Sequence, residues 1–211
     1  MKFTHALVCD NQSAAAVQFC LYQRFQKPSA AVSLAWLCQI CSPQAKTVFR
    51  WSEELHFVWG YARSLEPGDN VFTVQAAPLQ DGEQARLLWQ PSGSYAFQSA
   101  PAASPLIQTD ASLPAGLVAV GLGMQAECMC DTAALMVAAG PNGRYAFDTE
   151  IEYHLAWSPA CKLQNGDVLD INGLSSQRVV FPFGCRQLIA QLDETNRVTL
   201  APPLLRSTRL L

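Results

Sequence analysis

The sequence carries few charges, and it lacks an excess of basic residues. Lys and Arg number 14 and Asp and Glu 17, so the net charge is −3, and only 15% of the 211 residues are charged. A soluble domain typically has about 25% charged residues. Without a basic field, nucleic-acid binding through phosphate contacts is not expected. Half of the residues are hydrophobic, which together with the low charge argues against a disordered chain.

Long apolar segments are missing as well. No apolar run reaches the roughly 20 residues that a membrane-spanning helix needs. Near the first residue, Thr4 and His5 interrupt the apolar positions and Asp10-Asn11-Gln12 follows, whereas a signal peptide needs a continuous apolar core and a cleavage site. We therefore expect no membrane span, and a protein located in the cytoplasm or exported without a classical signal peptide.

The hydrophobic residues that are present alternate with a period of two. Between residues 144 and 157, aromatic and aliphatic side chains occupy odd positions and most charged ones occupy even positions. This alternation predicts one long half-buried strand, or two strands joined by a bend. Turn signals such as Pro67-Gly68-Asp69-Asn70 and Pro141-Asn142-Gly143 recur at short intervals. The sequence therefore predicts an all-β fold, an antiparallel β-sandwich of many short strands with little helix.

The length fits one domain or two small ones, and we expect a single β-sandwich domain over residues 1–211. Residues 99–115 are rich in Pro, Ala and Ser; they are interpreted as a crossover within one sandwich, and the alternative is a linker between two small β domains. Residues 125–139 hold the best candidate for a helix. Asp131-Thr132 in the middle of that segment equally suits a hairpin loop.

A glycine motif lies in the predicted strand 116–124. Residues 121–126 match the pattern G-x-G-x-x-A of dinucleotide-binding proteins. That function needs a strand followed by a helix whose N-terminus meets the pyrophosphate, and no alternating strand–helix pattern surrounds the motif. We interpret Gly121 and Gly123 as positions where another backbone approaches closely, and we expect no cofactor.

Two close pairs stand out among the eight cysteines. Cys38 and Cys41 form a CxxC motif, and Cys128 and Cys130 form a CxC motif. A structural zinc site needs four ligands that usually come in such pairs. These four residues are therefore the candidate ligands of a thiolate metal-binding or redox protein. The alternative is that they are reduced and pack as small buried hydrophobic side chains.

Aromatic residues gather in one part of the sequence. Trp36, Trp51, Trp59 and Tyr61 fall within 26 residues, and they are the candidate ligand-binding residues. Trp and Tyr side chains present a flat apolar body with a polar edge, which suits a sugar ring or a protein partner. The alternative, favoured for most of the cluster, is a core between two sheets.

No catalytic motif is recognisable, so no catalytic residue is assigned and an enzyme is not expected. The first function hypothesis is a non-catalytic protein that binds a carbohydrate or another surface ligand. The second is a self-assembling structural protein, a homo-oligomer that uses strand edges and the Leu-rich tail over residues 201–211.

A set of short motifs resembles one bacterial family in order and spacing. In the first half these are Ser33-Leu34-Ala35-Trp36-Leu37, Phe49-Arg50-Trp51, Phe57-Val58-Trp59-Gly60, Leu65-Glu66-Pro67-Gly68 and Gln75-Ala76-Ala77-Pro78. In the second half they are residues 120–124, Tyr153 with Trp157, residues 166–170 and Phe181-Pro182. The chain is similar here to the rhizosphere-induced protein family.

This resemblance covers roughly residues 15–200. It implies a small soluble bacterial protein that has no signal peptide and is expressed in a plant-associated or population-density context. It implies no reaction or ligand, so no catalytic residue is carried over. The sequence departs from the family pattern in its cysteines and in its Leu-rich tail, which leaves any ligand shared with the family open.

Overall fold

The fold was analysed in a computed structural model, which describes residues 4–24, 30–80, 83–102, 104–126, 132–159 and 162–203. These residues form sixteen strands, and none of them lies in a helix. In this part of the chain, therefore, no helix is long and apolar enough to cross a membrane. The predicted all-β fold is confirmed.

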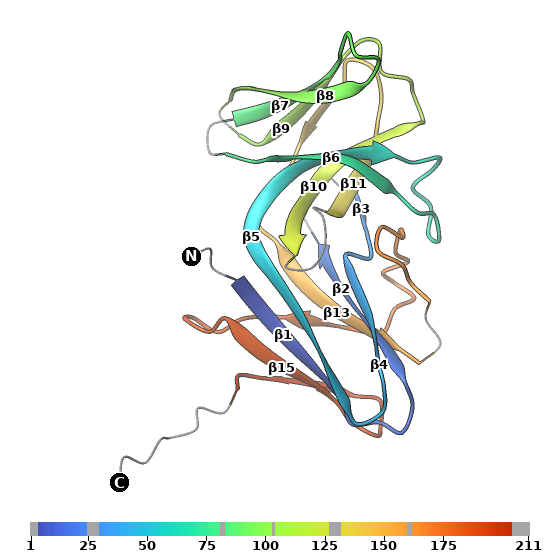
Figure 1. Cartoon of the computed structure of the whole chain (residues 1–211), viewed down its shortest axis with the longest axis vertical. Coiled ribbons are helices and arrows are strands. Elements are labelled where there is room, and N and C mark those ends of the chain that lie inside the picture. Colours follow the sequence, from blue (N-terminus) through green and yellow to red (C-terminus); the bar gives the residue numbers. More distant parts are fainter. Residues whose placement is uncertain are drawn as a thin grey trace.

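Eight strands form the largest sheet. In spatial order these are β16 (Val198–Ala201), β15 (Gln187–Leu192), β1 (Thr4–Asn11), β5 (Ala45–Tyr61), β10 (Val118–Ala126), β11 (Thr132–Ala139) and β3 (Val32–Ser33), with β6 (Phe72–Pro78) also paired to β5. The pairing is antiparallel except between β1 and β15. The long strand β5 links the two ends of the molecule, because its first half pairs with β1 and its second half with β6 (Figure 1).

Two four-stranded sheets accompany the large one at its two ends. The first, which we call the upper sheet, has the order β12 (Arg144–Ala146), β9 (Leu106–Thr109), β7 (Glu83–Trp89) and β8 (Tyr95–Pro101). The second, the lower sheet, has the order β14 (Ser176–Val179), β13 (Glu152–Ser158), β2 (Val17–Arg24) and β4 (Leu37–Cys41). Figure 1 shows the upper sheet beyond β6 and the lower sheet beside the first half of β5.

Each small sheet shares a hydrophobic core with the large sheet. The lower core joins Phe19 and Leu21 of β2 to Trp51 of β5, and the upper core joins Leu87 of β7 to Trp59 of β5. A strand buried on one face alternates inward and outward side chains, so the two tryptophans, eight residues apart, both point inward. The described fold therefore has two principal cores on one continuous strand.

The alternating segment 144–157 forms two strands that belong to different sheets. Tyr145 of β12 packs against the upper core, and Tyr153 and Leu155 of β13 belong to the lower core. The prediction of two strands joined by a bend is confirmed. Segment 99–115 contains the end of β8 and the whole of β9, and both of these strands flank β7 within one sheet.

The glycine motif lies where two backbones meet. Gly121 of β10 pairs with Met136 of β11, and a Cβ atom on Gly121 would overlap the carbonyl group of Leu135. The predicted close approach is therefore confirmed at this glycine. The helix considered for residues 125–139 is not formed in its described part, because residues 132–139 are β11, the antiparallel partner of β10.

Candidate functional site

Three of the four aromatic residues predicted to bind a ligand lie inside the protein. Trp36 and Trp51 are in the lower core and Trp59 is in the upper core, and each is at most 1% exposed. Large rings gain most from leaving water, and these rings lie between sheets with no free face for a ligand. The prediction is corrected for these three, which form core instead. Tyr61, the fourth, is 53% exposed.

The CxxC motif does not form one thiolate site. Cys38 and Cys41 lie three residues apart on β4, so they point to opposite faces of the lower sheet. Cys41 packs into the lower core, whereas Cys38 packs on the outer face beside Cys20. Two thiols on opposite faces cannot bind the same ion, which corrects the predicted metal site for this pair. Cys128 and Cys130 lie outside the described residues.

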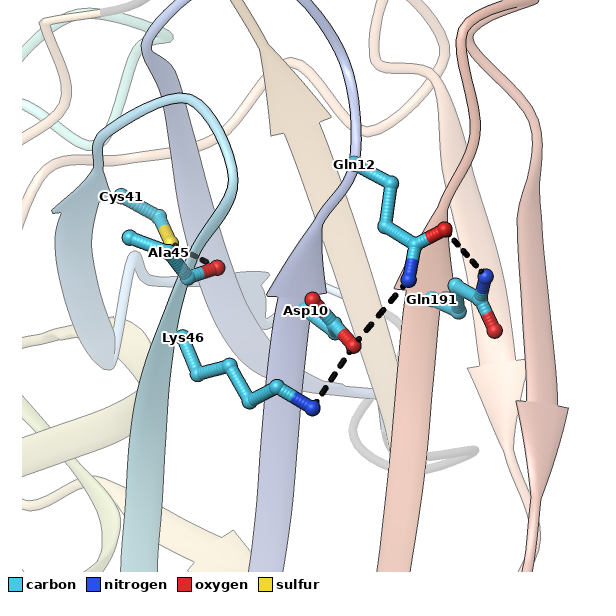
Figure 2. Close-up of polar contacts among 6 residues, drawn as sticks. All are labelled: Asp10, Gln12, Cys41, Ala45, Lys46 and Gln191. Atoms are coloured by element: carbon cyan, nitrogen blue, oxygen red, sulfur yellow. Dashed lines mark hydrogen bonds and ion pairs between the residues drawn. The ribbon is translucent and has the colours of Figure 1, made fainter.

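The polar groups at and around Cys41 have hydrogen-bond or ion-pair partners within the protein. Its Sγ donates to the carbonyl oxygen of Ala45 at 3.3 Å, and the nearby Asp10 carboxylate contacts Lys46 Nζ at 2.9 Å and Gln12 Nε2 at 3.5 Å (Figure 2). Burial raises the pKa of the Cys41 thiol, and a protonated thiol is a poor ligand. Among all described residues, no group of three or more His, Cys, Asp or Glu side chains could hold a metal.

A cluster of titratable residues lies beside the lower core, near the middle of β5, around a shallow cleft of about 210 Å³. The His5 ring stacks on Trp51 at 5.7 Å between centroids and meets the edge of Phe181 at 4.4 Å. Its Nδ1 lies 3.5 Å from Glu53 Oε1. Burial lowers the pKa of His5, partly opposed by Glu53. The neutral imidazole therefore acts here as part of a packed aromatic cluster.

The exposed aromatic side chains at the C-terminal end of β5 have a different setting. Tyr61, the last residue of β5, is paired across the strands with Phe72, the first residue of β6. Phe72 is 71% exposed, and Leu117, which lines a cleft with Tyr61, is 54% exposed. β5 and β6 approach so closely at Gly60 that a Cβ there would overlap the Phe72 carbonyl group. The strand pairing therefore fixes the backbone positions from which these two exposed rings project.

The connection between β5 and β6 is held by a second loop. Gly68 N donates to Val168 O at 3.0 Å, and Val168 N donates to Asp69 O at 2.7 Å. The Asn70 side chain donates from Nδ2 to Asp167 Oδ1 at 2.8 Å and to Asn165 O at 3.2 Å. These bonds fix the Pro67–Asn70 turn, so polar groups near Tyr61 and Phe72 are presented by an ordered loop.

Two clefts meet at Asn70. The smaller, of about 350 Å³, lies between Tyr61, Leu117 and the polar side chains of Arg63 and Asp69. The larger, of about 560 Å³, follows residues 70–76 along β6 to Ala133, Asn165 and Gly166. We call this pair of clefts the Asn70 site. Concave sites with a few fixed polar groups beside apolar walls are the usual form of ligand-binding sites.

Hydrogen-bonding groups remain available in the Asn70 site. The exposed Arg63 guanidinium has no hydrogen bond or ion pair within the described part of the chain. Gln75 Oε1 accepts from Trp59 Nε1 and from Phe97 N, both at 3.1 Å, which orients the amide and leaves its Nε2 group without a partner among the described residues. The site thus combines two exposed rings with oriented donors.

Known protein sequences match this chain over nearly its whole length. The sequence model of the RhiA family matches residues 3–202. The chain belongs to the RhiA family. A curated relative, Protein RhiA of Rhizobium leguminosarum bv. viciae, is 27% identical over 209 residues, covering 94% of this chain and 86% of that protein. No solved structure matches the chain. The resemblance to the rhizosphere-induced protein family is therefore confirmed, and RhiA membership by itself names no ligand.

Sequence reasoning found one member of the Asn70 site and missed another. Tyr61 was predicted because it belongs to the aromatic cluster. Phe72 was missed because it stands alone, 11 residues further on, and becomes a neighbour of Tyr61 only through the pairing of β5 with β6. The signal that could have found it is the Pro67-Gly68-Asp69-Asn70 turn, which brings the two residues together.

Proposed function

We propose that this member of the RhiA family is a non-catalytic binding protein that recognises a carbohydrate at the Asn70 site. The observation that carries the proposal is the exposed Tyr61–Phe72 pair, in which Tyr61 lines the smaller and Phe72 the larger of the two clefts that share Asn70. The faces of aromatic rings suit the apolar C–H faces of a sugar ring, and burying a ring face excludes water from the contact.

The polar groups of the Asn70 site supply the second requirement of a sugar site. Hydroxyl groups both donate and accept hydrogen bonds, and the site offers donors from Arg63 and Gln75 beside the carboxylate of Asp69. Among the described residues, these side chains are not part of a group of three or more His, Cys, Asp or Glu that could hold a metal ion. This composition supports recognition of a neutral polyhydroxylated ligand rather than a reaction.

The proposal is tested by titrating the full chain with a broad panel of soluble glycans, followed by isothermal calorimetry with those that respond. We expect Tyr61→Ala and Phe72→Ala each to weaken binding at least tenfold, about 1.4 kcal/mol. Phe183→Ala is the matched control, because Phe183 is fully exposed and lies outside both clefts. Tyr61→Phe keeps the ring and is expected to retain most of the affinity.

A panel that produces no response would contradict carbohydrate recognition. Binding that survives both ring removals would place the ligand elsewhere on the protein. The self-assembly hypothesis stays a prediction, because most of the Leu-rich tail, residues 204–211, lies outside the described part of the chain.

A further inference from the structure

Two cysteines far apart in the sequence face each other across the lower sheet. Cys20 of β2 and Cys38 of β4 are direct partners in the antiparallel register. Cys20 belongs to a small buried cluster with Tyr22 and Leu169 on the outer face of this sheet, and Cys38 packs against the same cluster. The two side chains therefore project from the same face, and neither cysteine forms a disulfide in this structure.

The backbone hydrogen bonds show which kind of pair this is. Cys38 N donates to Asn165 Oδ1 at 2.9 Å, so it points away from β2. On the other side of β2 lies β13, in which Trp157 N donates to Ser175 O and therefore points away from β2. Backbone N–H groups alternate in direction along a strand, so the N–H of the preceding residue, Ala156, points toward β2. Cys20 and Ala156 are therefore a hydrogen-bonded pair. The N–H of Cys20 thus points to β13. Cys20 and Cys38 consequently form a non-hydrogen-bonded pair.

This pair type brings the side chains close together. Opposite residues in a non-hydrogen-bonded pair have Cα atoms about 4.5 Å apart, closer than in the alternative type. Disulfides span Cα separations of about 4.4–6.8 Å. A bond between the two sulfur atoms therefore fits the existing register and needs no movement of one strand along the other.

The two thiols differ in access. Cys20 is 2% exposed, whereas Cys38 is only partly buried. The cover over the pair is the segment after residue 162, which Gln18 holds through two hydrogen bonds with the backbone of Leu163, at 2.7 and 2.9 Å. A small reagent can reach Cys38 first, and Cys20 is positioned beside it as the second thiol.

We propose that Cys20 and Cys38 are an oxidation site, at which a low-molecular-weight disulfide converts the two thiols into a cross-strand disulfide. The Cys38 thiolate attacks one sulfur of the reagent, whose S–S bond breaks and releases one small thiolate. The Cys20 thiolate then attacks the Cys38 sulfur of the mixed disulfide and releases the second small thiol. Two protein thiols are oxidised, one disulfide is reduced to two thiols, and the two protons pass to the leaving thiolates.

The expected consequence is a fold that is harder to unfold. The bond would close the chain segment between residues 20 and 38, which contains Trp36 of the lower core. A cross-link of this size restricts the unfolded chain, and for a protein of this length we expect Tm to rise by roughly 5–10 °C. This inference does not depend on the ligand of the Asn70 site.

The test uses the full reduced chain incubated with oxidised glutathione, blocked with an alkylating reagent, digested without reduction and analysed by mass spectrometry. We expect a peptide pair joined by Cys20 and Cys38, together with the increase in Tm. Cys38→Ala should abolish both, and Cys20→Ala should trap the mixed disulfide on Cys38. Cys185→Ala, a partly buried cysteine outside this pair, should change neither.

Three results would overturn the proposal. These are a Cys38 thiol that stays free under conditions that oxidise other thiols, a Cys20 or Cys38 joined to a different cysteine, and a wild-type chain that stops at the mixed disulfide. A cross-link that forms without any increase in Tm would reject its role in stabilising the fold.

Discussion

The two halves of β5 each carry a buried tryptophan, yet they end in opposite surroundings. Around Trp51 the lower core is closed by further rings, with Tyr153 at 5.2 Å and Trp36 at 5.9 Å between centroids. Around Trp59 the rings continue outward, because Tyr61 lies 5.5 Å away and is half exposed. The same strand thus provides a sealed core at one end and an open aromatic surface at the other.

The difference follows from what covers each half. The first half of β5 is packed against the lower sheet, whose inner face supplies Phe19, Leu21 and Leu155. Beyond Trp59, the strand reaches Tyr61 at the rim, where the neighbouring residues belong to loops and to the ends of β6 and β10. Rings in the lower core stabilise the fold through burial, whereas exposed rings stabilise nothing until a partner covers them.

The largest effect is expected from opening the sealed half. Trp51→Ala should lower the free energy of unfolding by about 3–5 kcal/mol, because it removes a ring from the middle of the lower core and leaves a cavity. Trp89→Ala is the matched control, since Trp89 is half exposed and contacts Tyr95 by its edge. It should cost about 1 kcal/mol or less. Urea denaturation measures both, and equal losses would break the distinction between the two ends.

A smaller effect is expected from the tight backbone contact beside the upper core. Gly121→Ala should cost about 1–3 kcal/mol, because the added Cβ overlaps the Leu135 carbonyl group and forces β10 away from β11. Gly140→Ala is the control, because a Cβ at Gly140 has no neighbour within 4 Å, and it should stay within about 0.5 kcal/mol of wild type. An unchanged denaturation midpoint for Gly121→Ala would show that the strands can separate freely.

The dependence of stability on pH should be modest, and we expect it to arise from two histidines in or beside the lower sheet. Burial lowers the pKa of both His5 and His154 from the ordinary value of 6.5. Below pH 6.5 the unfolded chain then binds more protons than the folded one, so stability is lost as the pH falls through the lower folded pKa values. In denaturation measured between pH 7.5 and 5, His5→Phe combined with His154→Phe should reduce this loss. A double variant with the wild-type profile would contradict the assignment.

Sequence patterns predicted the strands well because alternation is a local property. The segment over residues 144–157 shows this, since its large apolar residues are all at odd positions. The pattern could not assign Tyr145 and Tyr153 to different sheets, because partner strands are chosen by contacts between residues far apart in the sequence. The interpretation of Gly121 as a position where another backbone approaches closely was correct, because few other physical causes favour a glycine within an apolar strand.

The candidate sites were predicted less well, and the reasons are specific. A cluster of tryptophans is equally compatible with a core and with a binding surface, and only the position of the lower sheet buries Trp36 and Trp51. The CxxC spacing suits a metal in a turn or loop, but Cys38 and Cys41 lie on a strand, where a separation of three residues puts them on opposite faces. The partner of Cys38 is Cys20, a neighbour through strand pairing rather than through sequence.

The sequence by itself determined the all-β class, the low charge of the chain and its membership of the RhiA family. These properties depend on composition, on local alternation and on the order of short motifs. The tertiary structure alone decided which aromatic rings remain exposed, which cysteines face each other and where the clefts lie. Burial and proximity are set by strands paired across the whole chain, so a scarcity of charge could indicate a packed protein but not which of its surfaces is left open.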